Sequence, residues 1–527
     1  MDAFDWKYAG EGGKHAVFAY YPGGKVQNEF CGRMLRIQKK DLAIAASFSG
    51  HSGHSFHAES HRSDEMEDQV SFIAKVISPC LEYYVDVPSV LPLWWTFLQH
   101  LRDLTLSSGK VPLAREKGWN FSSSNRSFDF SICPLGLLVV DYRKISTPGW
   151  ITYETNLLGS VSIEIKPKAG YRAFSPLVDP LHRIKYLESR FALLQRLHSE
   201  GYVTKGWRTD SDSFESSSYD PEFFFSNDPT KIQNALASLF SCPQNNLRVW
   251  FEDSMVIGLG CEERTDKRKV LSKFFRRDDV DSADAESVFG SIVGGMVSAI
   301  LHEETLLARL QKLQKLDILD ADGAILLYEH LVRLCDGSFE TAERLLDHID
   351  DNETTNELVH ELLAASPLPV PSQITHINEL CREIESFRRL LVQYSPTLPP
   401  LIEINFARDR AMKLLDLLTP EESRFVLRNW LLSLASCDVS IFITLRLLDT
   451  HLNNDSKSEK GGKITSKIDC GKPGIIRWYP GGKFVARYIY NVKVIDCGRK
   501  AARKLRSRRD VESAFRFIQP QGAFFAS

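Results

Sequence analysis

The sequence predicts an α+β protein in which a β-rich amino-terminal lobe, residues 1–140, precedes a larger, mostly helical carboxy-terminal lobe, residues 141–527. Three observations support this prediction. A chain of 527 residues exceeds the size at which one hydrophobic core keeps growing, so two or more lobes are expected. Strand-like apolar runs dominate the first lobe, and longer segments with helical spacing dominate from about residue 176. The 43% of hydrophobic and 25% of charged residues are typical of a soluble globular protein.

The predicted elements of the first lobe are short strands and one aromatic helix. HAVFAYY (15–21) and RMLRIQKK (33–40) have the composition of strands, whereas LPLWWTFLQHLRDL (91–104) has the spacing of a helix. Strands return at GLLVVD (136–141) and SIEIKPK (162–168). In the second lobe we expect helices over 181–200 and 228–240. We expect surface loops or insertions over 209–220 and 452–467, and a solvated helix end at the acidic run 347–357.

The segment VFGSIVGGMVSAIL (288–301) is the longest uncharged apolar stretch worth testing as a membrane span. It is too short to cross a bilayer, and the spacing of Gly290 and Gly294 predicts two closely packed helices instead. The amino-terminus lacks the apolar core of a signal peptide, and the ten cysteines contain no CxxC pair, as in a reducing compartment. We therefore expect a cytoplasmic and/or nuclear protein without a membrane span.

Charge excludes one broad class of function. The chain has 65 Lys and Arg against 68 Asp and Glu, a net charge of -3, so the whole molecule is not a generic polyanion binder. Any affinity for phosphates must come from local clusters of cations. One such cluster is the strand-like SIEIKPK, in which Glu164, Lys166 and Lys168 alternate with apolar residues. This strand is either a solvated edge strand or the wall of a pocket for an anion.

The first lobe carries a candidate phosphate loop. YAGEGGKHAVF (8–18) places Gly10, Gly12 and Gly13 before a strand, and glycines let backbone N–H groups approach phosphate oxygens. The alternative is an ordinary turn. On the following strand, Arg36 could meet the same phosphates or face solvent.

Two aspartates have the setting that phosphoryl transfer requires. Asp438 interrupts a long apolar stretch, and Asp496 closes the strand-like NVKVID (491–496). A carboxylate in apolar surroundings is costly unless it is paired or holds a cation. One carboxylate could accept the proton of an attacking hydroxyl and the other could hold Mg²⁺. The alternative is that each caps a helix or a turn.

Three further segments are candidates for ligand binding. CGRKAARKLRSRR (497–509) has seven Arg or Lys among thirteen residues and, if helical, places Lys500, Lys504 and Arg508 on one face. This stripe could face a polyanion or solvent, or be a nuclear localisation signal or nucleic-acid patch. PQNNLRVW (243–250) offers Asn245, Asn246 and Arg248, as a turn entering a strand or as ligand contacts. For HSGHSFHAESHR (51–62), the Ser and Gly residues favour a mobile loop over the alternative of a metal site.

These motifs, in this order, resemble the inositol-pentakisphosphate 2-kinase family over most of the chain. DWKYAGEGGKHAVF is similar to the opening of that family, EIKPK is its most diagnostic motif, and PQNNLRV is a second one. CDVSIFI and VIDCGRKAARK resemble two later segments of the family. The resemblance implies a two-lobed, kinase-like fold related to the inositol polyphosphate kinases. It also implies a phosphotransferase that uses ATP and Mg²⁺ to phosphorylate the axial 2-hydroxyl of inositol 1,3,4,5,6-pentakisphosphate, giving inositol hexakisphosphate, phytic acid.

The resemblance also implies roles for individual residues. It implies contacts with the nucleotide for Gly12, Gly13, Lys14, His15, Arg36, Asp141, Glu164 and Arg248. It implies contacts with the inositol phosphate for Arg126, Lys168, Arg190, His198, Asn245, Lys500, Lys504 and Arg508. Asp438 would be the general base, Lys166 would act at the nucleotide as a second catalytic residue, and Asp496 would bind Mg²⁺.

Several positions depart from the family pattern. Ala9 replaces an arginine in the glycine loop, Leu194 and His198 replace a histidine and a lysine, and Arg508 replaces a tyrosine. Asp-x-Asp has become Asp496-Cys497-Gly498, and the Cys/His zinc site of plant and animal members has no CxxC counterpart, so we predict no structural zinc. We expect a monomer that binds ATP and a small-molecule substrate, without nucleic acid or membrane. The alternatives are a non-catalytic, degenerate kinase that binds inositol phosphates or nucleic acid, and a different inositol polyphosphate kinase specificity.

Overall fold

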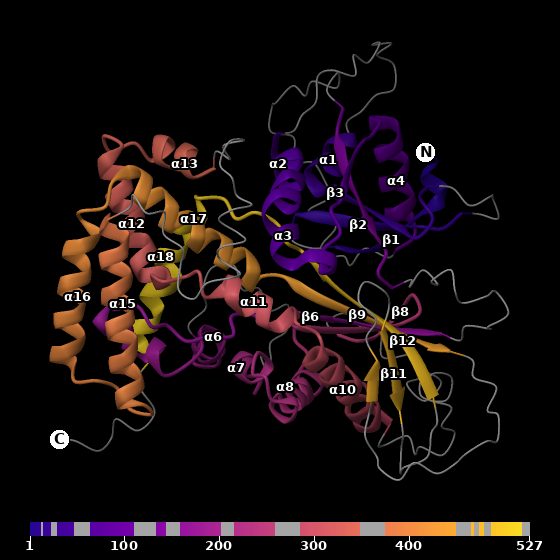
Figure 1. Cartoon of the computed structure of the whole chain (residues 1–527). Helices are drawn as coiled ribbons and strands as arrows, with labels where there is room; N and C mark the ends of the chain where they lie inside the picture. Colours follow the sequence, from indigo (N-terminus) through magenta and orange to yellow (C-terminus); the bar gives the residue numbers. More distant parts are fainter. Residues whose placement is uncertain are drawn as a thin grey trace, which may run out of the picture. The chain divides into compact units, whose positions relative to one another are not determined.

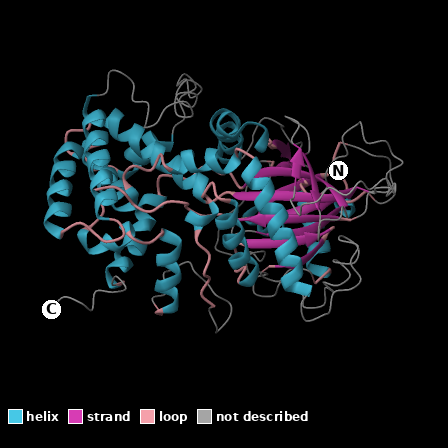
Figure 2. Cartoon of the chain, turned by 60° about the horizontal axis from the view of Figure 1, so that its bottom comes forward, coloured by secondary structure: helices cyan, strands magenta, loops and turns pink. Residues whose placement is uncertain are grey.

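The computed structural model describes twelve segments of the chain: 1–11, 14–22, 29–46, 64–109, 133–143, 159–201, 215–258, 285–347, 375–448, 465–467, 474–478 and 486–518. These residues form helices and two antiparallel sheets, which confirms the α+β prediction (Figures 1 and 2). The chain divides into two compact units: unit 1 comprises residues 1–78 and 85–148, and unit 2 comprises residues 79–84 and 149–527.

Unit 1 is built on a five-stranded sheet with the strand order β1-β2-β3-β5-β4. Its strands are β1 (Trp6–Glu11), β2 (His15–Tyr20), β3 (Arg33–Gln38), β4 (Ser89–Pro92) and β5 (Leu135–Val140). Its helices are η1 (Ala3–Asp5), α1 (Lys39–Ala45), α2 (Asp64–Phe72), η2 (Ile73–Ile77) and α4 (Trp95–Ser107). The structure confirms the strands predicted over 15–21, 33–40 and 136–141 and the helix predicted over 91–104. The strand β3 is shorter than predicted, because it ends at Gln38 and α1 begins at Lys39.

Apolar side chains on one face of this sheet make the core of unit 1. Phe18 on β2 and Leu35 on β3 are fully buried, and they pack with Trp95 and Leu98 of α4. Burial alternates along β3, as expected for a sheet with one face toward the core. β1 and β2 pair antiparallel with a register shift between Tyr8 and Gly10, so Gly10 of the candidate phosphate loop lies within β1, opposite Val17.

Unit 2 contains a seven-stranded antiparallel sheet with the order β10-β11-β12-β9-β6-β7-β8. Its strands are β6 (Ser160–Ile165), β7 (Leu247–Phe251), β8 (Ser254–Ile257), β9 (Ser440–Leu448), β10 (Thr465–Lys467), β11 (Gly474–Trp478) and β12 (Ala486–Ile495). The prediction of a mostly helical second lobe did not anticipate this sheet, although the sequence indicated strands at SIEIKPK and NVKVID, which are parts of β6 and β12. The long strands β9 and β12 of this sheet pair over nine residue pairs, from Arg487 with Leu448 to Ile495 with Ser440.

Strand β6 lies in the middle of this sheet, between β7 and β9. Ile163 and Ile165 are fully buried, and so is Ser162 on the opposite face. The alternative of a solvated edge strand for SIEIKPK is therefore wrong. Both faces of β6 are covered, and its one charged residue, Glu164, is buried too.

Helices make up the rest of unit 2. They are α3 (Ser78–Leu81), η3 (Glu82–Tyr84), η4 (Pro180–Tyr186), α6 (Arg190–Ser199), α7 (Pro221–Phe224), α8 (Pro229–Ser241), α10 (Ala285–Glu303), α11 (Leu306–Gln314), α12 (Asp320–Leu334), α13 (Phe339–Asp347), α15 (Thr375–Tyr394), α16 (Leu401–Leu415), α17 (Pro420–Cys437), α18 (Lys504–Ala514) and η6 (Phe515–Phe517). Leu327, Leu331, Leu380 and Leu427 represent the core that α12, α15 and α17 share. In Figure 1, α12, α15, α16 and α18 lie together at the left, away from the sheet of this unit.

Residues 79–84 belong to unit 2, although the chain on both sides of them belongs to unit 1. The hydroxyl groups of Tyr83 and Tyr84 donate hydrogen bonds to the Glu304 carboxylate, at 2.9 and 2.5 Å. Tyr490 of β12 donates to the other oxygen of Glu304 at 3.3 Å. This tyrosine cluster joins the segment 79–84 to the end of α10 and to the sheet.

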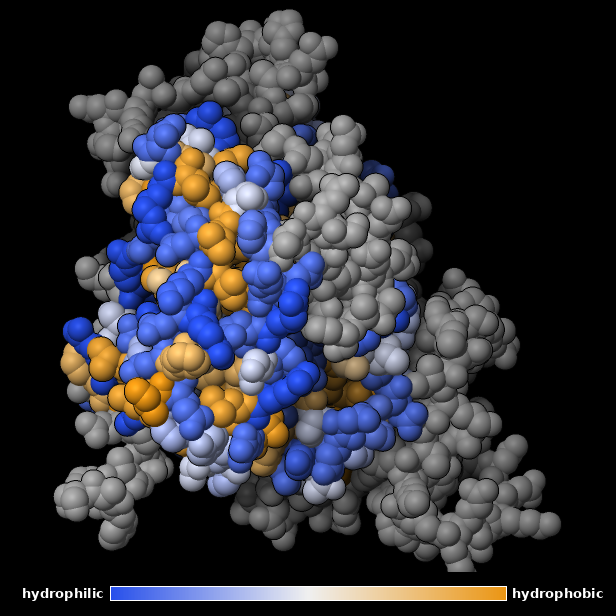
Figure 3. All heavy atoms as spheres, turned by 60° about the vertical axis from the view of Figure 1, so that its left-hand side comes forward, coloured by the Kyte–Doolittle hydropathy of each residue, from blue (hydrophilic) through white to orange (hydrophobic). Residues whose placement is uncertain are grey.

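Helices α8 and α10 pack closely, as the GxxxG spacing predicted. A Cβ atom built on Gly290 would lie 3.3 Å from Cγ of Phe240 on α8, and one on Gly294 would lie 3.7 Å from its ring. Among the described residues, no helix is both long enough and apolar enough to cross a membrane. Figure 3 shows the side that lies at the left in Figure 1, where apolar surface is interspersed with polar surface. On α16, Ile402 and Phe406 are exposed apolar residues.

We expect the substitution Gly290→Leu to destabilise unit 2 by about 1–3 kcal/mol, because the new side chain must enter the space of the Phe240 ring. Ser291→Leu is the matched control, since Ser291 is exposed on the same helix. Thermal unfolding of both variants measures the effect. Equal unfolding temperatures would show that α8 and α10 do not need the small residue.

Candidate active site at the ends of four strands

Four strands of unit 2 meet at one end of the sheet. Ile165, the last residue of β6, pairs with Leu247 at the start of β7 and with Ile441 near the start of β9. Ile495, the last residue of β12, pairs with Ser440, the first residue of β9. Because antiparallel neighbours run in opposite directions, the residues that follow β6 and β12 lie beside those that precede β7 and β9. We call this region the strand-end site; it contains Glu164, Lys166, Lys168, Asn245, Arg248, Asp438, Asp496 and Lys500.

The segment after β6 leaves the sheet abruptly. The N–H of Lys166 donates to the carbonyl oxygen of Asn246 at 2.9 Å, and Pro167 then has no N–H to continue the ladder. Lys168 adopts a φ of +62°, in the left-handed region. The prediction that Glu164, Lys166 and Lys168 alternate along one strand is therefore wrong beyond Ile165, since a turn and not the pleat of the sheet orients Lys168.

Glu164 forms the buried polar centre of the site. Its carboxylate accepts a hydrogen bond from the Ser440 hydroxyl at 2.8 Å and lies 3.4 Å from a guanidinium nitrogen of Arg248, its cross-strand partner. A second nitrogen of Arg248 donates to the side chain of Asn245 at 3.2 Å. These contacts join the EIKPK and PQNNLRV motifs directly, and they leave Glu164 without the cost of an unpaired buried charge.

Asp438 lies at the carboxy-terminal end of α17, as the C-cap residue. The alternative that Asp438 caps a helix is therefore correct for its backbone, whose N–H donates to the carbonyl oxygen of Ala435. The expectation that it is embedded in apolar surroundings is wrong, because its side chain is 49% exposed. A carboxylate is disfavoured at this end of a helix dipole, and the ammonium group of Lys500 compensates it at 2.7 Å. Although burial opposes ionisation, Lys500, with weaker contributions from Lys168 and Arg508, lowers the pKa of Asp438 below its ordinary value.

Lys168 and Arg508 are cations without an anionic partner in direct contact. Among the described residues, neither side chain has an ion pair or a hydrogen bond. Burial lowers the pKa of Lys168, and the nearby ammonium groups of Lys166 and Lys500 add to this effect, whereas Asp438 opposes it. Burial also lowers the pKa of Arg508, with a contribution from Arg190. The carboxylates that act on these cations at longer range, Asp438 on both and Glu512 on Arg508, already contact other cations. Half-buried cations in such a place are costly in the absence of a ligand, so this arrangement favours an anionic ligand.

Asp496 follows the last residue of β12 and adopts a φ of +61°. Since Ile495 pairs with Ser440, Asp496 and Asp438 leave the same end of the same strand pair. Asp496 is half-buried, and its oxygens are hard donors of the kind that Mg²⁺ prefers. Mg²⁺ commonly takes one or two carboxylates and completes its shell with phosphates and water, so this donor fits the ion.

The basic segment 497–509 does not form the single helical stripe that the sequence predicted. Helix α18 begins only at Lys504, so Lys500 lies in the turn before it. Lys504 is exposed and Arg508 half-buried. Lys500 and Arg508 still approach the same carboxylate, Asp438, because the chain folds back between them.

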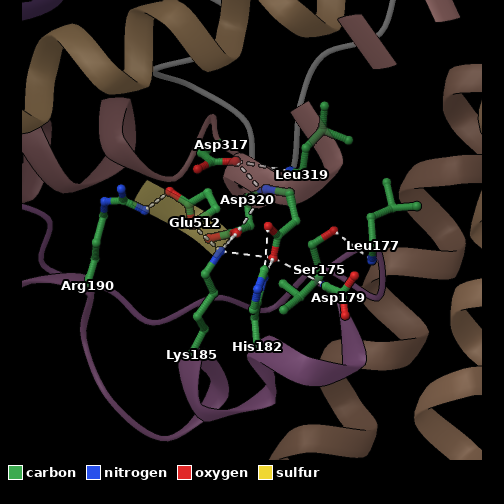
Figure 4. Close-up of polar contacts among 12 residues, drawn as sticks. Ser175, Leu177, Asp179, His182, Lys185, Arg190, Asp317, Leu319, Asp320 and Glu512 are labelled. Carbon is green, nitrogen blue, oxygen red and sulfur yellow. Dashed lines mark hydrogen bonds and ion pairs between the residues drawn. The ribbon is translucent and has the colours of Figure 1, made fainter. Parts of the chain in front are cut away.

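Close to α18, three carboxylates surround a buried lysine, and Figure 4 shows most of this cluster. The Nζ atom of Lys185 lies 2.5 Å from Asp320, 3.0 Å from Asp322 and 2.5 Å from Glu512. These carboxylate oxygens lie within 4.8 Å of one another, as in a metal site, but the ammonium group already contacts all three. The cluster links η4, α12 and α18, and only the run of aspartates in DILDADG (317–323) could have signalled it in the sequence.

Arg190 also belongs to this cluster. Its guanidinium group lies 2.5 Å from the Glu512 carboxylate and stacks over the ring of Phe515, whose centroid is 5.4 Å away. The contact of Arg190 with substrate stays a prediction. In this structure its guanidinium group pairs with the carboxylate of Glu512. His198, the other candidate on α6, is half-buried near the carboxy-terminal end of that helix.

Four predicted site residues are described in unit 1. Lys14 and His15 lie where the β1–β2 loop enters β2, and Arg36 lies on β3 opposite Val17. The carboxylate of Asp141 is buried and accepts two hydrogen bonds from the Arg143 guanidinium, both at 2.9 Å. Its side chain is thus engaged, and a contact with a purine would need its backbone. Gly12, Gly13, Arg126 and the histidine-rich segment 51–62 lie outside the described residues.

The strand-end site places several cations beside the carboxylate of Asp438, an arrangement typical of proteins that bind anionic ligands. The chain belongs to the inositol-pentakisphosphate 2-kinase family, whose sequence model matches residues 8–514. The resemblance that the motifs indicated is therefore confirmed.

Individual relatives agree with the family match. An inositol-pentakisphosphate 2-kinase of Arabidopsis thaliana is 28% identical over 392 residues, which cover 69% of this chain and 79% of the relative. The inositol-pentakisphosphate 2-kinase IPK1 of Oryza sativa subsp. indica is 27% identical over 346 residues, 63% of this chain and 70% of the relative.

Lys185 should be essential for stability. We expect Lys185→Met to lower the free energy of unfolding by about 3–5 kcal/mol, because it leaves three buried carboxylates without their common cation. Lys413→Met is the control, since Lys413 is exposed on α16. Denaturant unfolding compares the two variants, and a loss no larger than that of the control would contradict a stabilising role for the cluster.

Asp317 should make stability depend on pH. Burial and the charge of Asp320 raise the pKa of Asp317 to about 7, from an ordinary value of 3.8. Between these values the folded state holds a proton that the unfolded chain has lost, so stability should decrease as the pH rises through this window. We expect Asp317→Asn to weaken this decrease, as measured by thermal unfolding between about pH 4 and 8. Parallel curves for wild type and variant would contradict the assignment.

Proposed function

We propose that this protein transfers the γ-phosphoryl group of ATP to the 2-hydroxyl group of inositol 1,3,4,5,6-pentakisphosphate and so produces inositol hexakisphosphate. The observation that carries the proposal is the pair of cations, Lys168 and Arg508, that lack an anionic partner beside Asp438. Five phosphates bring roughly eight to ten negative charges near neutral pH. A chain with a net charge of -3 can meet them only through such local clustering.

In this proposal Asp438 is the general base. Lys500 keeps the carboxylate ionised near neutral pH by lowering its pKa. An ionised carboxylate can accept the proton of the attacking hydroxyl as the new O–P bond forms. A phosphate of the substrate would compete with Asp438 for Lys500 and would lie near Lys168. The cations that bind the phosphate groups of the substrate would then place its free hydroxyl group next to Asp438.

The remaining residues near Asp438 would bind the inositol phosphate. Lys168, Lys500 and Arg508 supply the charge, and a planar guanidinium group can bind a phosphate through two hydrogen bonds. Asn245 would add an uncharged donor through its Nδ2 atom, since Arg248 donates to its Oδ1 atom. Arg126, Arg190, His198 and Lys504 are weaker candidates for the same ligand.

The family resemblance gives candidate nucleotide-binding residues in each of the two units. Glu164, Lys166 and Arg248 are the candidates on unit 2. Those on unit 1 are Gly12, Gly13, Lys14, His15, Arg36 and Asp141. Backbone N–H groups of a glycine loop can bind phosphate oxygens, and a kinase-like fold would supply such a loop from the β1–β2 hairpin.

Asp496 would bind Mg²⁺. The bound ion would neutralise charge on the nucleotide phosphates. Lys166 and Arg248 would add positive charge beside the same phosphates. These two cations are in place before the reaction, so they would stabilise the negative charge of the phosphoryl group while it is transferred. Glu164 holds Arg248 in place for this task through the contact at 3.4 Å.

Several expectations about the whole protein stay predictions. They are a monomeric state, a cytoplasmic or nuclear location, no binding of nucleic acid and no structural zinc. Metal analysis of the purified protein tests the last of these. One tightly held zinc per chain would contradict it.

Asp438→Asn is the central test. We expect kcat to decrease by at least about 100-fold, because the amide group cannot accept the proton, while the affinity for inositol pentakisphosphate is retained. Product analysis should place the new phosphate of the wild-type product at the 2-position. Asp416→Asn is a matched control, since Asp416 is also the C-cap residue of a helix and contacts an arginine at 3.4 Å.

Two results would count against the proposal. Unchanged turnover by Asp438→Asn would remove the assignment of the base. A wild-type protein that binds inositol pentakisphosphate without any phosphoryl transfer would favour the non-catalytic alternative.

A further inference from the structure

Gln314, the last residue of α11, is fully buried and points its side-chain amide at the segment that carries Lys168. Its Nε2 atom donates a hydrogen bond to the carbonyl oxygen of Lys168 at 2.9 Å. Its Oε1 atom accepts one from the N–H of Gly170 at 2.8 Å. One side chain therefore binds the backbone at Lys168 and again two residues later.

The backbone at Lys168 needs such support. Its φ of +62° is uncommon for a residue other than glycine, and conformations of this kind persist only where the surroundings determine them. Gly170 cannot be replaced easily, since a Cβ atom there would lie 2.1 Å from the ring of Phe225. The backbone at Gly170 thus packs closely against Phe225. Because Gln314 bonds both Gly170 and Lys168, it fixes the backbone of Lys168 relative to Gly170.

Two other contacts hold the same segment at its start. The hydroxyl group of Tyr219 donates to the carbonyl oxygen of Pro167 at 2.9 Å, and the N–H of Lys166 donates to Asn246 at 2.9 Å. Neither contact reaches Lys168 itself. Among the described residues, only Gln314 makes a hydrogen bond to the backbone of Lys168, so this side chain determines how the turn is completed.

We propose that Gln314 is a positioning residue for the inositol phosphate: it fixes the left-handed turn at Lys168 and thereby directs the Lys168 ammonium group toward Asp438. The identity of the ligand rests on the proposed function. Gln314 itself touches no reacting atom. Its effect on the ligand passes through Lys168. The Lys168 ammonium group already lies close enough to Asp438 for their charges to interact.

A merely structural role is the alternative, because a buried amide with satisfied hydrogen bonds stabilises any fold. Coupling separates the two roles. If Gln314 acts through Lys168, its replacement should cost little binding once Lys168 has been removed. If it only stabilises unit 2, the two losses should add.

The test is a double-mutant cycle on the affinity for inositol 1,3,4,5,6-pentakisphosphate, measured by titration calorimetry with the full chain. Removing a hydrogen-bonded charge with Lys168→Ala should weaken binding by about 10- to 100-fold. We expect Gln314→Met to weaken it by at least about 5-fold alone and by less than about 2-fold in the Lys168→Ala background. In turnover assays, the KM for the inositol phosphate should rise and the KM for ATP should not.

Ser433→Ala is the matched control. The hydroxyl group of Ser433 is buried and donates to the backbone carbonyl oxygen of Gln314 at 2.5 Å, so its loss disturbs the same residue without touching the Lys168 turn. We expect this variant to bind like the wild type. Gln314→Glu is the second variant if Gln314→Met does not fold, since a carboxylate keeps the acceptor for Gly170 and loses the donor for Lys168.

Each outcome decides the inference. Additive losses in the cycle, or equal effects of Ser433→Ala and Gln314→Met, would overturn it and leave the proposed function intact. A wild-type protein that binds the pentakisphosphate without phosphoryl transfer would overturn the proposed function, and the cycle would still decide the role of Gln314. A wild-type protein that does not bind this ligand would overturn both.

Discussion

The pairing of β9 with its two neighbours is the constraint on which the strand-end site depends. β6 pairs with β9 over six residue pairs and β12 pairs with it over nine. A shift of either register by one residue would turn the buried isoleucines of these strands toward the wrong face, so the core enforces both registers. The same registers determine that the chain after β6, the chain after β12 and the end of α17 arrive at one place. Burial of apolar side chains thus positions charged ones that lie almost 340 residues apart in sequence.

Two groups of charges in unit 2 behave in opposite ways. Lys185 has three carboxylates around it, and Arg190 shares one of them, so this cluster is satisfied internally and stabilises the fold. Lys168 and Arg508 lie near Asp438, which already has Lys500 as its partner. Arg508 also interacts at longer range with Glu512, which already contacts Lys185 and Arg190. The first group needs nothing more. The second has cationic charge in excess, which is unfavourable for an empty protein and useful for one that binds phosphates.

The sequence predicted local features well and spatial ones poorly. The hairpin around the glycine loop, the strand at 33–40 and the close packing at Gly290 were predictable, because each depends on neighbours in sequence or on residue size. That β6 lies in the middle of a sheet was not predictable, since its partners β7 and β9 come about 80 and 280 residues later. The alternation of Glu164, Lys166 and Lys168 was misleading for the same reason. Pro167 ends the ladder, and the positive φ of Lys168 depends on Gln314, which no local pattern connects to it.

Residues 79–84 have a consequence for any attempt to divide the protein. The chain enters unit 2 at Pro79, returns to unit 1 after Tyr84, and enters unit 2 again at Gly149, so a cut near residue 148 does not separate the two units. A fragment that began at 149 would expose Glu304 and the hydroxyl group of Tyr490 where two tyrosine side chains had covered them. Proteolytic or recombinant dissection at that boundary would therefore give a larger fragment with a defect beside β12, the strand that directly precedes Asp496.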